Sequence, residues 1–194
     1  MAAADPPRRS DATRAEILRA AQSRFAHDGY QKATIRAIAA DAGIDPSMVM
    51  RYYGSKERLF AAAVDLDLRL PDFTSIPRRQ LGATLVRHFL DRWETDPAGD
   101  ALLMLLRSAA TDETAARRLY GIFRQQLVPA VADLVGDPDE AVERAGLIST
   151  QLLGLALCRR ILRLAPVAAL SPEAVVTWIG PTIQRYVTGP LPRA

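Results

Sequence analysis

The sequence predicts an all-α fold, and three observations support this prediction. Apolar residues recur at helical spacing along almost the whole chain, whereas alternating β-type runs between turn signals are absent. Capping residues and helix breakers divide the chain into about nine helical segments. The chain has 194 residues, 49% hydrophobic and 24% charged, which is enough for one or two domains with a substantial core.

Four predicted helices occupy the first third of the chain. Gly29 ends the first helix, and Thr34 can cap the second. Asp45 followed by Pro46 marks the start of the third, because the carboxylate caps free amides and proline fits the first helical position. Ser55 caps the fourth. The predicted ranges are 11–27, 35–42, 46–53 and 56–70.

Five further helices are predicted at 77–94, 98–108, 112–135, 137–164 and 171–187. Pro129 is expected to bend the third of these, and Pro181 to kink the last. Residues 1–10 carry acid, prolines and arginines without an apolar stretch, so they predict a disordered tail rather than a signal peptide.

Composition limits the possible classes of protein. Cys158 is the only cysteine, which excludes an intramolecular disulfide and a cysteine-built zinc site and fits a reducing, cytoplasmic location. The longest uncharged run, residues 145–158, is too short for an ordinary transmembrane helix, so we expect a buried helix and no membrane partner. His27 and His88 are far apart and form no metal-spaced pair, and glycine-rich phosphate loops and nucleophile elbows are missing. The expectation is therefore a protein with no catalytic residues, metal or cofactor.

The charge distribution is uneven. Residues 1–60 contain ten Lys and Arg against seven Asp and Glu, whereas the remainder contains fifteen of each. The whole net charge of +3 thus lies in the first third of the chain, which is a weak indication of nucleic-acid binding at that end.

The second and third helices have the dimensions of a helix-turn-helix, in which the second helix of the pair enters the major groove of DNA. Between them lies a tight turn at Ala42-Gly43-Ile44, where Gly43 can adopt the left-handed conformation that branched side chains resist. With the apolar side chains packed behind it, the third helix turns these residues outward: Pro46, Ser47, Met50, Arg51 and Tyr52.

Residues 33–44 and 52–60 resemble the N-terminal signature of TetR-type transcriptional repressors. Residues 14–21 and 25–30 are similar to it as well, and residues 153–189 resemble one sub-branch of the family. The resemblance implies a repressor with a DNA-binding domain at 11–56, a connecting helix at 56–70, and a ligand-binding and dimerisation domain at 71–194. Its partners would be double-stranded DNA, a second copy of the chain and an unidentified small-molecule effector.

Four positions have chemistry suited to the DNA contacts that the resemblance implies. Thr34 and Lys56, at the amino ends of helices, could bind phosphates. Arg36 is the candidate for a guanine contact, because a guanidinium can bond two acceptors on one base edge. Ser47 is small enough to let the third helix approach the bases.

Met50 departs from the family pattern, which usually has at this position a tyrosine that touches the DNA backbone. Tyr52 is the candidate to replace that contact. Met50 is also the one feature that favours the alternative hypothesis, a helical small-molecule-binding protein without DNA binding.

The helix at 137–164 is apolar on more than one face, so it must be buried on several sides. Either it is the central core helix of a monomer, or one side packs against a second copy. Small residues at four-residue spacing permit a close helix crossing, and the resemblance implies a four-helix interface completed by the helix at 171–187. The predicted interface residues are Gly146, Thr150, Leu153, Gly154, Trp178, Ile179, Ile183 and Tyr186.

The same resemblance implies a largely apolar ligand cavity in the C-terminal domain. Aromatic and methionine residues at helical spacing are as consistent with an ordinary core, so both interpretations remain open at this stage. The predicted lining residues are Phe89, Trp93, Leu103, Met104, Arg107, Tyr120 and Phe123.

Overall fold

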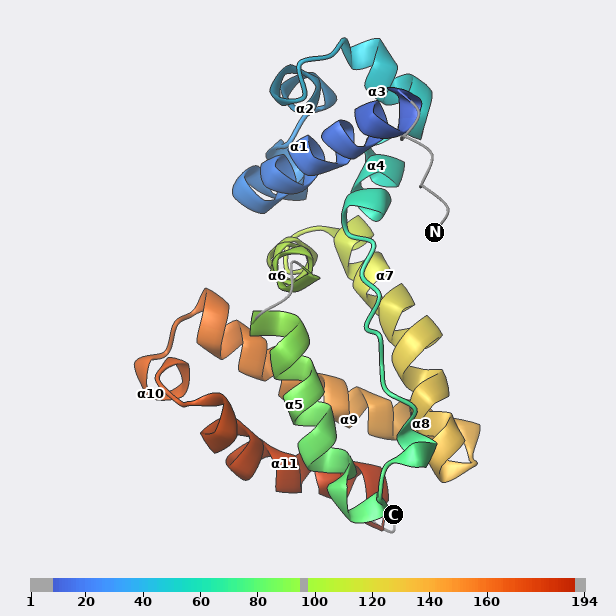
Figure 1. Cartoon of the computed structure of the whole chain (residues 1–194), viewed down its shortest axis with the longest axis vertical. Coiled ribbons are helices and arrows are strands. Elements are labelled where there is room, and N and C mark those ends of the chain that lie inside the picture. Colours follow the sequence, from blue (N-terminus) through green and yellow to red (C-terminus); the bar gives the residue numbers. More distant parts are fainter. Residues whose placement is uncertain (1–8, 95–97, 191–194) are drawn as a thin grey trace, which may run out of the picture.

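The computed structural model describes residues 9–94 and 98–190, which form helices joined by turns and loops, with no strand among them (Figure 1). Of the predicted tail, residues 1–8 lie outside the described residues, and Arg9 already begins the first helix. The helices are α1 (Arg9–Lys32), α2 (Ile35–Asp41), α3 (Pro46–Tyr53), α4 (Lys56–Ala63), α5 (Leu81–Glu94), α6 (Ala98–Ala109), α7 (Glu113–Ile122), α8 (Val128–Val135), α9 (Pro138–Ala156), α10 (Ala165–Ala168) and α11 (Pro172–Thr188). Short turns of other helical types are η1 (Phe73–Ser75), η2 (Arg78–Gln80), η3 (Phe123–Leu127) and η4 (Leu157–Ile161). The prediction of an all-α fold is confirmed.

Helices α1 to α4 form one end of the molecule, which we call the head (Figure 1). Its centre is an aromatic cluster in which the rings of Phe25 and Phe60 meet edge to face at 5.0 Å and those of Tyr30 and Phe60 at 4.7 Å. This core continues without a break into α6, whose Leu105 is fully buried. The head is therefore packed directly against the rest of the protein.

Helices α5 to α11 form the body, whose core lies between α5, α8, α9 and α11. The crossing of α5 and α11 is very close, since a Cβ atom added at Gly82 would lie 2.3 Å from the carbonyl oxygen of Gly180. The side chain of Gln184 accepts a hydrogen bond from the Gly82 amide at 2.9 Å and donates one to the Arg78 carbonyl at 2.9 Å. Glycine is thus required where these two helices touch.

The two prolines that are expected to bend helices both lie within helical segments, and the bends themselves stay predictions. Pro129 is the second residue of α8, directly after the π-type turn η3, and this turn accommodates the proline within one long α7–η3–α8 rod. Pro181 lies inside α11, which continues to Thr188. The small helix α10 was not predicted, and the helix at 137–164 ends earlier, at Ile161 of η4.

The fourth predicted helix is shorter than expected. It was placed at 56–70, but α4 ends at Ala63, and residues 64–70, which we call the linker, form no helix. Side chains replace the missing helical hydrogen bonds: the amide of Leu68 donates to Oε1 of Gln126 at 2.7 Å, and Nε2 of Gln126 donates to the Leu66 carbonyl at 2.9 Å. Residues 65–70 alternate charged and leucine side chains, but they form no strand.

The combined span of α9 and η4, Pro138–Ile161, is long and apolar enough by length and composition alone to cross a membrane. In the fold it packs against α8 and α11, and Ala141, Ala145 and Ile148 are fully buried. Because the core helix of a soluble protein meets the same criterion, this span is explained by its place in the body.

Candidate functional site

The head contains a helix-turn-helix made of α2 and α3. Gly43 has a φ of +66°, and the amide of Ile44 donates to the Ala39 carbonyl at 3.0 Å, which closes the turn. Thr34 caps α2 by accepting from the Ala37 amide at 3.1 Å, and the carboxylate of Asp45 caps α3. Side-chain caps therefore fix the amino end of each helix, and Gly43 forms the turn between them.

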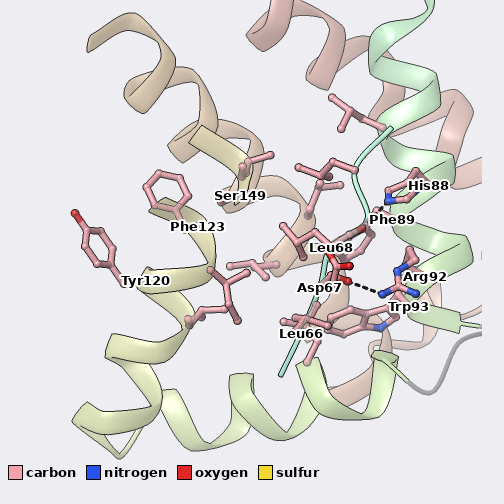
Figure 2. Close-up of a pocket in the computed structure, with 18 of the residues that line it drawn as sticks. Leu66, Asp67, Leu68, His88, Phe89, Arg92, Trp93, Tyr120, Phe123 and Ser149 are labelled. Atoms are coloured by element: carbon pink, nitrogen blue, oxygen red, sulfur yellow. Dashed lines mark hydrogen bonds between the residues drawn. The ribbon is translucent and has the colours of Figure 1, made fainter. Parts of the chain in front are cut away.

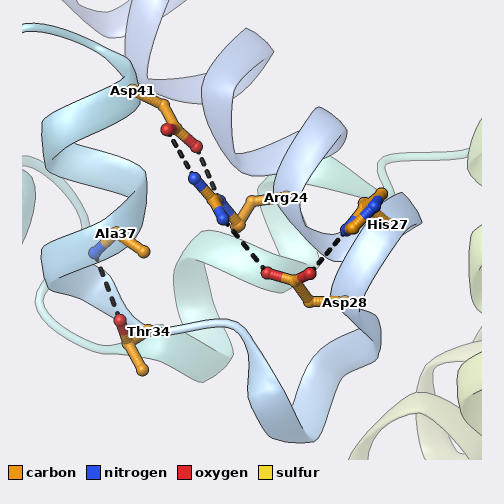
Figure 3. Close-up of polar contacts among 6 residues, drawn as sticks. All are labelled: Arg24, His27, Asp28, Thr34, Ala37 and Asp41. Atoms are coloured by element: carbon orange, nitrogen blue, oxygen red, sulfur yellow. Dashed lines mark hydrogen bonds and ion pairs between the residues drawn. The ribbon is translucent and has the colours of Figure 1, made fainter.

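Arg24 of α1 braces α2 from behind (Figure 3). Its Nε donates to Oδ2 of Asp41 at 2.7 Å and its Nη2 to Oδ1 at 2.5 Å, while Nη1 reaches Asp28 at 3.3 Å. The hydrogen bond from Arg24 holds the pKa of Asp41 below its usual value and raises that of the guanidinium. The two-point contact fixes the orientation of α2 on α1, although an exposed ion pair contributes little free energy.

The outward face of the helix-turn-helix carries most of the residues predicted to contact DNA. Thr34, Arg36, Ser47, Met50 and Arg51 are exposed, whereas Pro46 and Tyr52 are half-buried. The Thr34 hydroxyl uses an oxygen lone pair for its cap, so its proton remains available to donate to another acceptor.

Lys56 does not extend outward with them. Its Nζ donates to the Gln31 carbonyl at 3.1 Å and lies 4.6 Å from the centre of the Tyr30 ring. Burial lowers the pKa of Lys56. The reason for this departure is that α4 starts beside the end of α1, where the ammonium finds both a carbonyl and an aromatic face.

The body contains a cavity of about 350 Å³ enclosed by α5, α6, α7, η3, α9 and the linker. Figure 2 shows Tyr120 and Phe123 on one side of it, across from Phe89 and Trp93 on the other. These four predicted residues therefore line one hollow, with Tyr120 at its exposed edge.

The other three predicted lining residues lie elsewhere. Leu103, Met104 and Arg107 line a separate hollow against Gln22 and its neighbours on α1, while the adjacent Leu102 lines the main cavity. Leu103 and Leu102 differ by one position on α6, which rotates their side chains by about 100°. Packing of the head on α6 thus directs these three side chains away from the cavity.

The linker forms one wall of the cavity, a role that was not predicted from the sequence. Leu66, Leu68 and Leu70 all line it. Arg92 of α5 donates to the Asp67 carbonyl at 2.5 Å, and Nε2 of His88 is hydrogen-bonded to the Leu68 carbonyl at 2.9 Å (Figure 2). The alternation of leucine with charged residues at 65–70 is the sequence signal that could have indicated this wall.

The outer faces of α9 and α11 carry exposed apolar side chains. Trp178 is 72% exposed, Leu147 38% and Leu157 39%. A Cβ atom added at Gly146 or Gly154 would meet nothing within 4 Å, so this side of α9 is open.

Among the other predicted interface residues, Thr150 is exposed and Ile179 and Tyr186 are half-buried. Two residues face inward instead: Ile183 is fully buried in the protomer, and Leu153 lines the cavity. Ile183 is directed into the core because α11 packs tightly on α5 along that face.

No metal centre is visible in residues 9–94 and 98–190, where no group of three or more His, Cys, Asp or Glu side chains is arranged to hold an ion. The single cysteine, Cys158, is half-buried in η4.

Comparison with known proteins identifies the family of both parts. Residues 17–63 match the model described as bacterial regulatory proteins, tetR family, and residues 80–187 match the tetracyclin repressor-like C-terminal domain. A TetR-family regulator from Streptomyces coelicolor has a similar structure, with a TM-score of 0.69 and 30% identity over 95% of this chain and 99% of that one. NalD of Pseudomonas aeruginosa shares the fold with a TM-score of 0.71 at 20% identity, covering 92% of this chain and 96% of its own.

Two relatives are similar in sequence. The transcriptional repressor SCO4008 of Streptomyces coelicolor is 41% identical over 73 residues, so the match spans only 36% of this chain and 36% of that protein. The transcriptional regulator BetI of Agrobacterium fabrum is 27% identical over 175 residues, which is 84% of each protein. With both family models matched in order, and with the helix-turn-helix and helical body in place, the chain belongs to the TetR family of bacterial regulatory proteins and is a DNA-binding transcriptional regulator.

Proposed function

We propose that this protein is a homodimeric repressor that binds a palindromic operator through α3 and is released by a small apolar molecule bound in the body. The observation that carries the proposal is the position of the linker, which continues directly from α4 of the head and forms a wall of the cavity. One segment of chain thus touches both functional parts of the molecule.

DNA binding is supported by the exposed side chains on α2 and α3. Arg36 can bond guanine in the major groove, Ser47 allows close approach, and Thr34 and Arg51 can donate to phosphates. SCO4008 is named a repressor, and NalD is described as the secondary repressor of a multidrug efflux pump. By analogy we propose repression as the mode of regulation here.

Dimerisation is supported by the open, apolar outer faces of α9 and α11. Exposed tryptophan and leucine side chains make the kind of surface that a partner covers. In a two-fold dimer each of these helices would meet its own copy, and the two α3 helices would read two symmetric half-sites. Of the predicted interface set, we retain Gly146, Thr150, Gly154, Trp178, Ile179 and Tyr186.

Ligand release is supported by the hydrogen bonds that hold the linker. His88 and Arg92 line the cavity and bond the linker backbone, so a molecule that fills the cavity must fit against that arrangement or change it. A ligand that binds better to the changed arrangement shifts the population of head orientations. The protein would act by binding alone, without catalysis, in the cytoplasm.

The test begins with the purified full chain and a pool of random duplexes. We expect selection of an inverted-repeat sequence, bound more weakly as salt rises. Titration of apolar compounds into that complex should then identify some that release the DNA. Absence of any duplex binding at low salt, with and without compounds, would contradict the proposal and favour a small-molecule-binding protein that does not bind DNA.

A further inference from the structure

A cationic cluster lies where α1 meets the reading helix α3. The guanidinium carbon of Arg14 lies over the ring of Tyr52, 5.7 Å from its centre, and that of Arg51 lies over the same ring, also at 5.7 Å. Both distances are within the range of a cation–π contact. We call these three residues the Tyr52 cluster.

Two features show that the position of Arg14 is built into the fold. The hydroxyl of the adjacent Tyr53 donates to the backbone carbonyl of Arg14 at 3.3 Å, which joins this turn of α1 to the end of α3. Tyr52 itself is half-buried and packs against the core of the head, so its ring has a fixed support. The guanidinium is therefore held at α3 from both its backbone and its side chain.

The cluster lacks a compensating negative charge. In the described part of the chain, no carboxylate pairs with the guanidinium of Arg14 or Arg51, in contrast to Arg24, which binds two aspartates. Two like charges beside one ring repel each other unless an anion lies near them. Each guanidinium keeps its N–H donors available, and phosphate is the anion that such planar donors match on DNA.

We propose that Tyr52 holds Arg14 and Arg51 together as a binding site for DNA backbone phosphates, so that α1 adds a contact beside the groove that α3 enters. Arg14 was not among the residues predicted to contact DNA. Tyr52 acts in this site as a positioning residue through the face of its ring, not through its hydroxyl. The inference rests on the proposed DNA-binding function and assigns residues to it.

The test measures how DNA binding by the full-length protein depends on salt, with the duplex that the wild-type protein selects from a random pool. Loss of one phosphate contact per protomer removes two per dimer, so Arg14→Gln should reduce the slope of log affinity against log salt by about two. Arg19→Gln is the matched control. Arg19 is also exposed on α1, but it lies five residues after Arg14 and therefore points about 140° away around the helix. Its substitution should leave the slope unchanged.

Two substitutions at Tyr52 separate the ring from the hydroxyl. Tyr52→Phe keeps the ring and should bind as the wild type does, whereas Tyr52→Leu releases both guanidinium groups and should lose at least as much slope as Arg14→Gln. The double variant Arg14→Gln with Tyr52→Leu should lose little more than Tyr52→Leu alone, because the loss of the ring already removes the contact of Arg14. In an ethylation interference experiment, ethylation of one symmetric pair of phosphates should weaken binding by the wild-type protein but not by Arg14→Gln. A general loss of stability would not produce this difference.

Several results would overturn this proposal. An unchanged slope for Arg14→Gln would show that Arg14 makes no phosphate contact, and an equal loss for Tyr52→Phe and Tyr52→Leu would assign the effect to the hydroxyl. If the wild-type protein binds no duplex at all, the proposed function fails first and the phosphate site fails with it. Circular dichroism of each variant establishes that it is folded before its slope is compared.

Discussion

The head and the body use polar side chains for different purposes. In the head, Thr34, Asp45 and Ser55 cap the helices that immediately follow them, so each bond spans two or three residues. In the body, the corresponding bonds join distant segments: Gln126 reaches back to the linker 58 residues away, and Gln184 reaches Gly82 across 102 residues. These caps thus fix where the helices of the head begin, whereas the bonds of Gln126 and Gln184 join segments of the body that are distant in the sequence.

This difference indicates which part can respond to a ligand. The caps of the head fix the amino ends of α2, α3 and α4, and the buried core behind these helices supports them as one reading surface. The long-range bonds of the body include those that hold a cavity wall, and bonds of this kind can be exchanged when the cavity fills. Sensitivity to a ligand therefore belongs to the body, and the head should move as a unit.

The largest expected effect comes from the aromatic centre of the head. Phe60→Ala removes a ring that is 1% exposed and contacts both Phe25 and Tyr30, so it should lower the free energy of unfolding by about 3–5 kcal/mol. Phe123→Ala in the body should cost less, because that ring borders an existing cavity. Urea denaturation followed by circular dichroism measures both, and equal losses would contradict the distinction between a closed head and a hollow body.

The crossing of α5 and α11 should be the next most sensitive point. Gly82→Ala would place a Cβ atom against backbone atoms of Gly180 and Gln184, with an expected cost of about 1–3 kcal/mol. Gly121→Ala in α7 is its control: a Cβ atom there meets nothing within 4 Å, and alanine favours helix by up to about 1 kcal/mol. Thermal unfolding should shift in opposite directions for the two variants, and a stabilised Gly82→Ala protein would refute the close approach.

Removing the side chain of Gln126, which holds the linker, should have a smaller effect on the free energy of unfolding. It should also change hydrogen exchange in the linker itself. Gln126→Leu loses two hydrogen bonds, each contributing about 1 kcal/mol. Hydrogen exchange at the Leu68 amide, which donates to Gln126, should become faster, while the exposed neighbour variant Gln125→Leu leaves it unchanged. Unaltered exchange at Leu68 in Gln126→Leu would mean that the linker is held by other contacts.

The smallest expected effect concerns the ion pair behind α2. The pKa of Asp41 is lowered in the folded protein by Arg24, so the stabilisation is present above the ordinary value of 3.8 and is lost as the pH falls through the folded pKa. In Arg24→Gln the pKa of Asp41 should return toward its ordinary value in a carboxyl NMR titration. Asp45, whose lowered pKa arises from bonds to Ser47, provides the control within the same spectrum and should not change.

The contrast between local and distant contacts also explains what the sequence could predict. The third helix was predicted at 46–53, where α3 lies, because Asp45, Pro46 and Gly54 act on residues beside them. The end of α4 was predicted seven residues too late, because the bonds that hold the linker come from Gln126, His88 and Arg92. A single sequence contains the local signals but not the pairing of distant segments.

The candidate sites follow the same rule. The outward face of α3 follows from helical periodicity once the apolar side chains are assigned to the core. For α6, periodicity identifies apolar faces but cannot say which one meets the cavity, and Leu103 and Met104 were assigned to it although they face α1. Ile183 was expected at a partner surface for the same reason, because only the packing of α5 on α11 shows that it is buried.

One of the two tryptophans of the chain is buried and the other is exposed, which gives the protein a pair of natural fluorescent reporters. Trp93 is 4% exposed in the wall of the hollow, and Trp178 is 72% exposed on the outside of α11. An indole shielded from water emits at shorter wavelength than a hydrated one, so the two signals can be separated by colour. A change in the shorter-wavelength emission, from Trp93, would then report occupancy of the cavity. A change in the longer-wavelength emission, from Trp178, would report subunit association, without any added label.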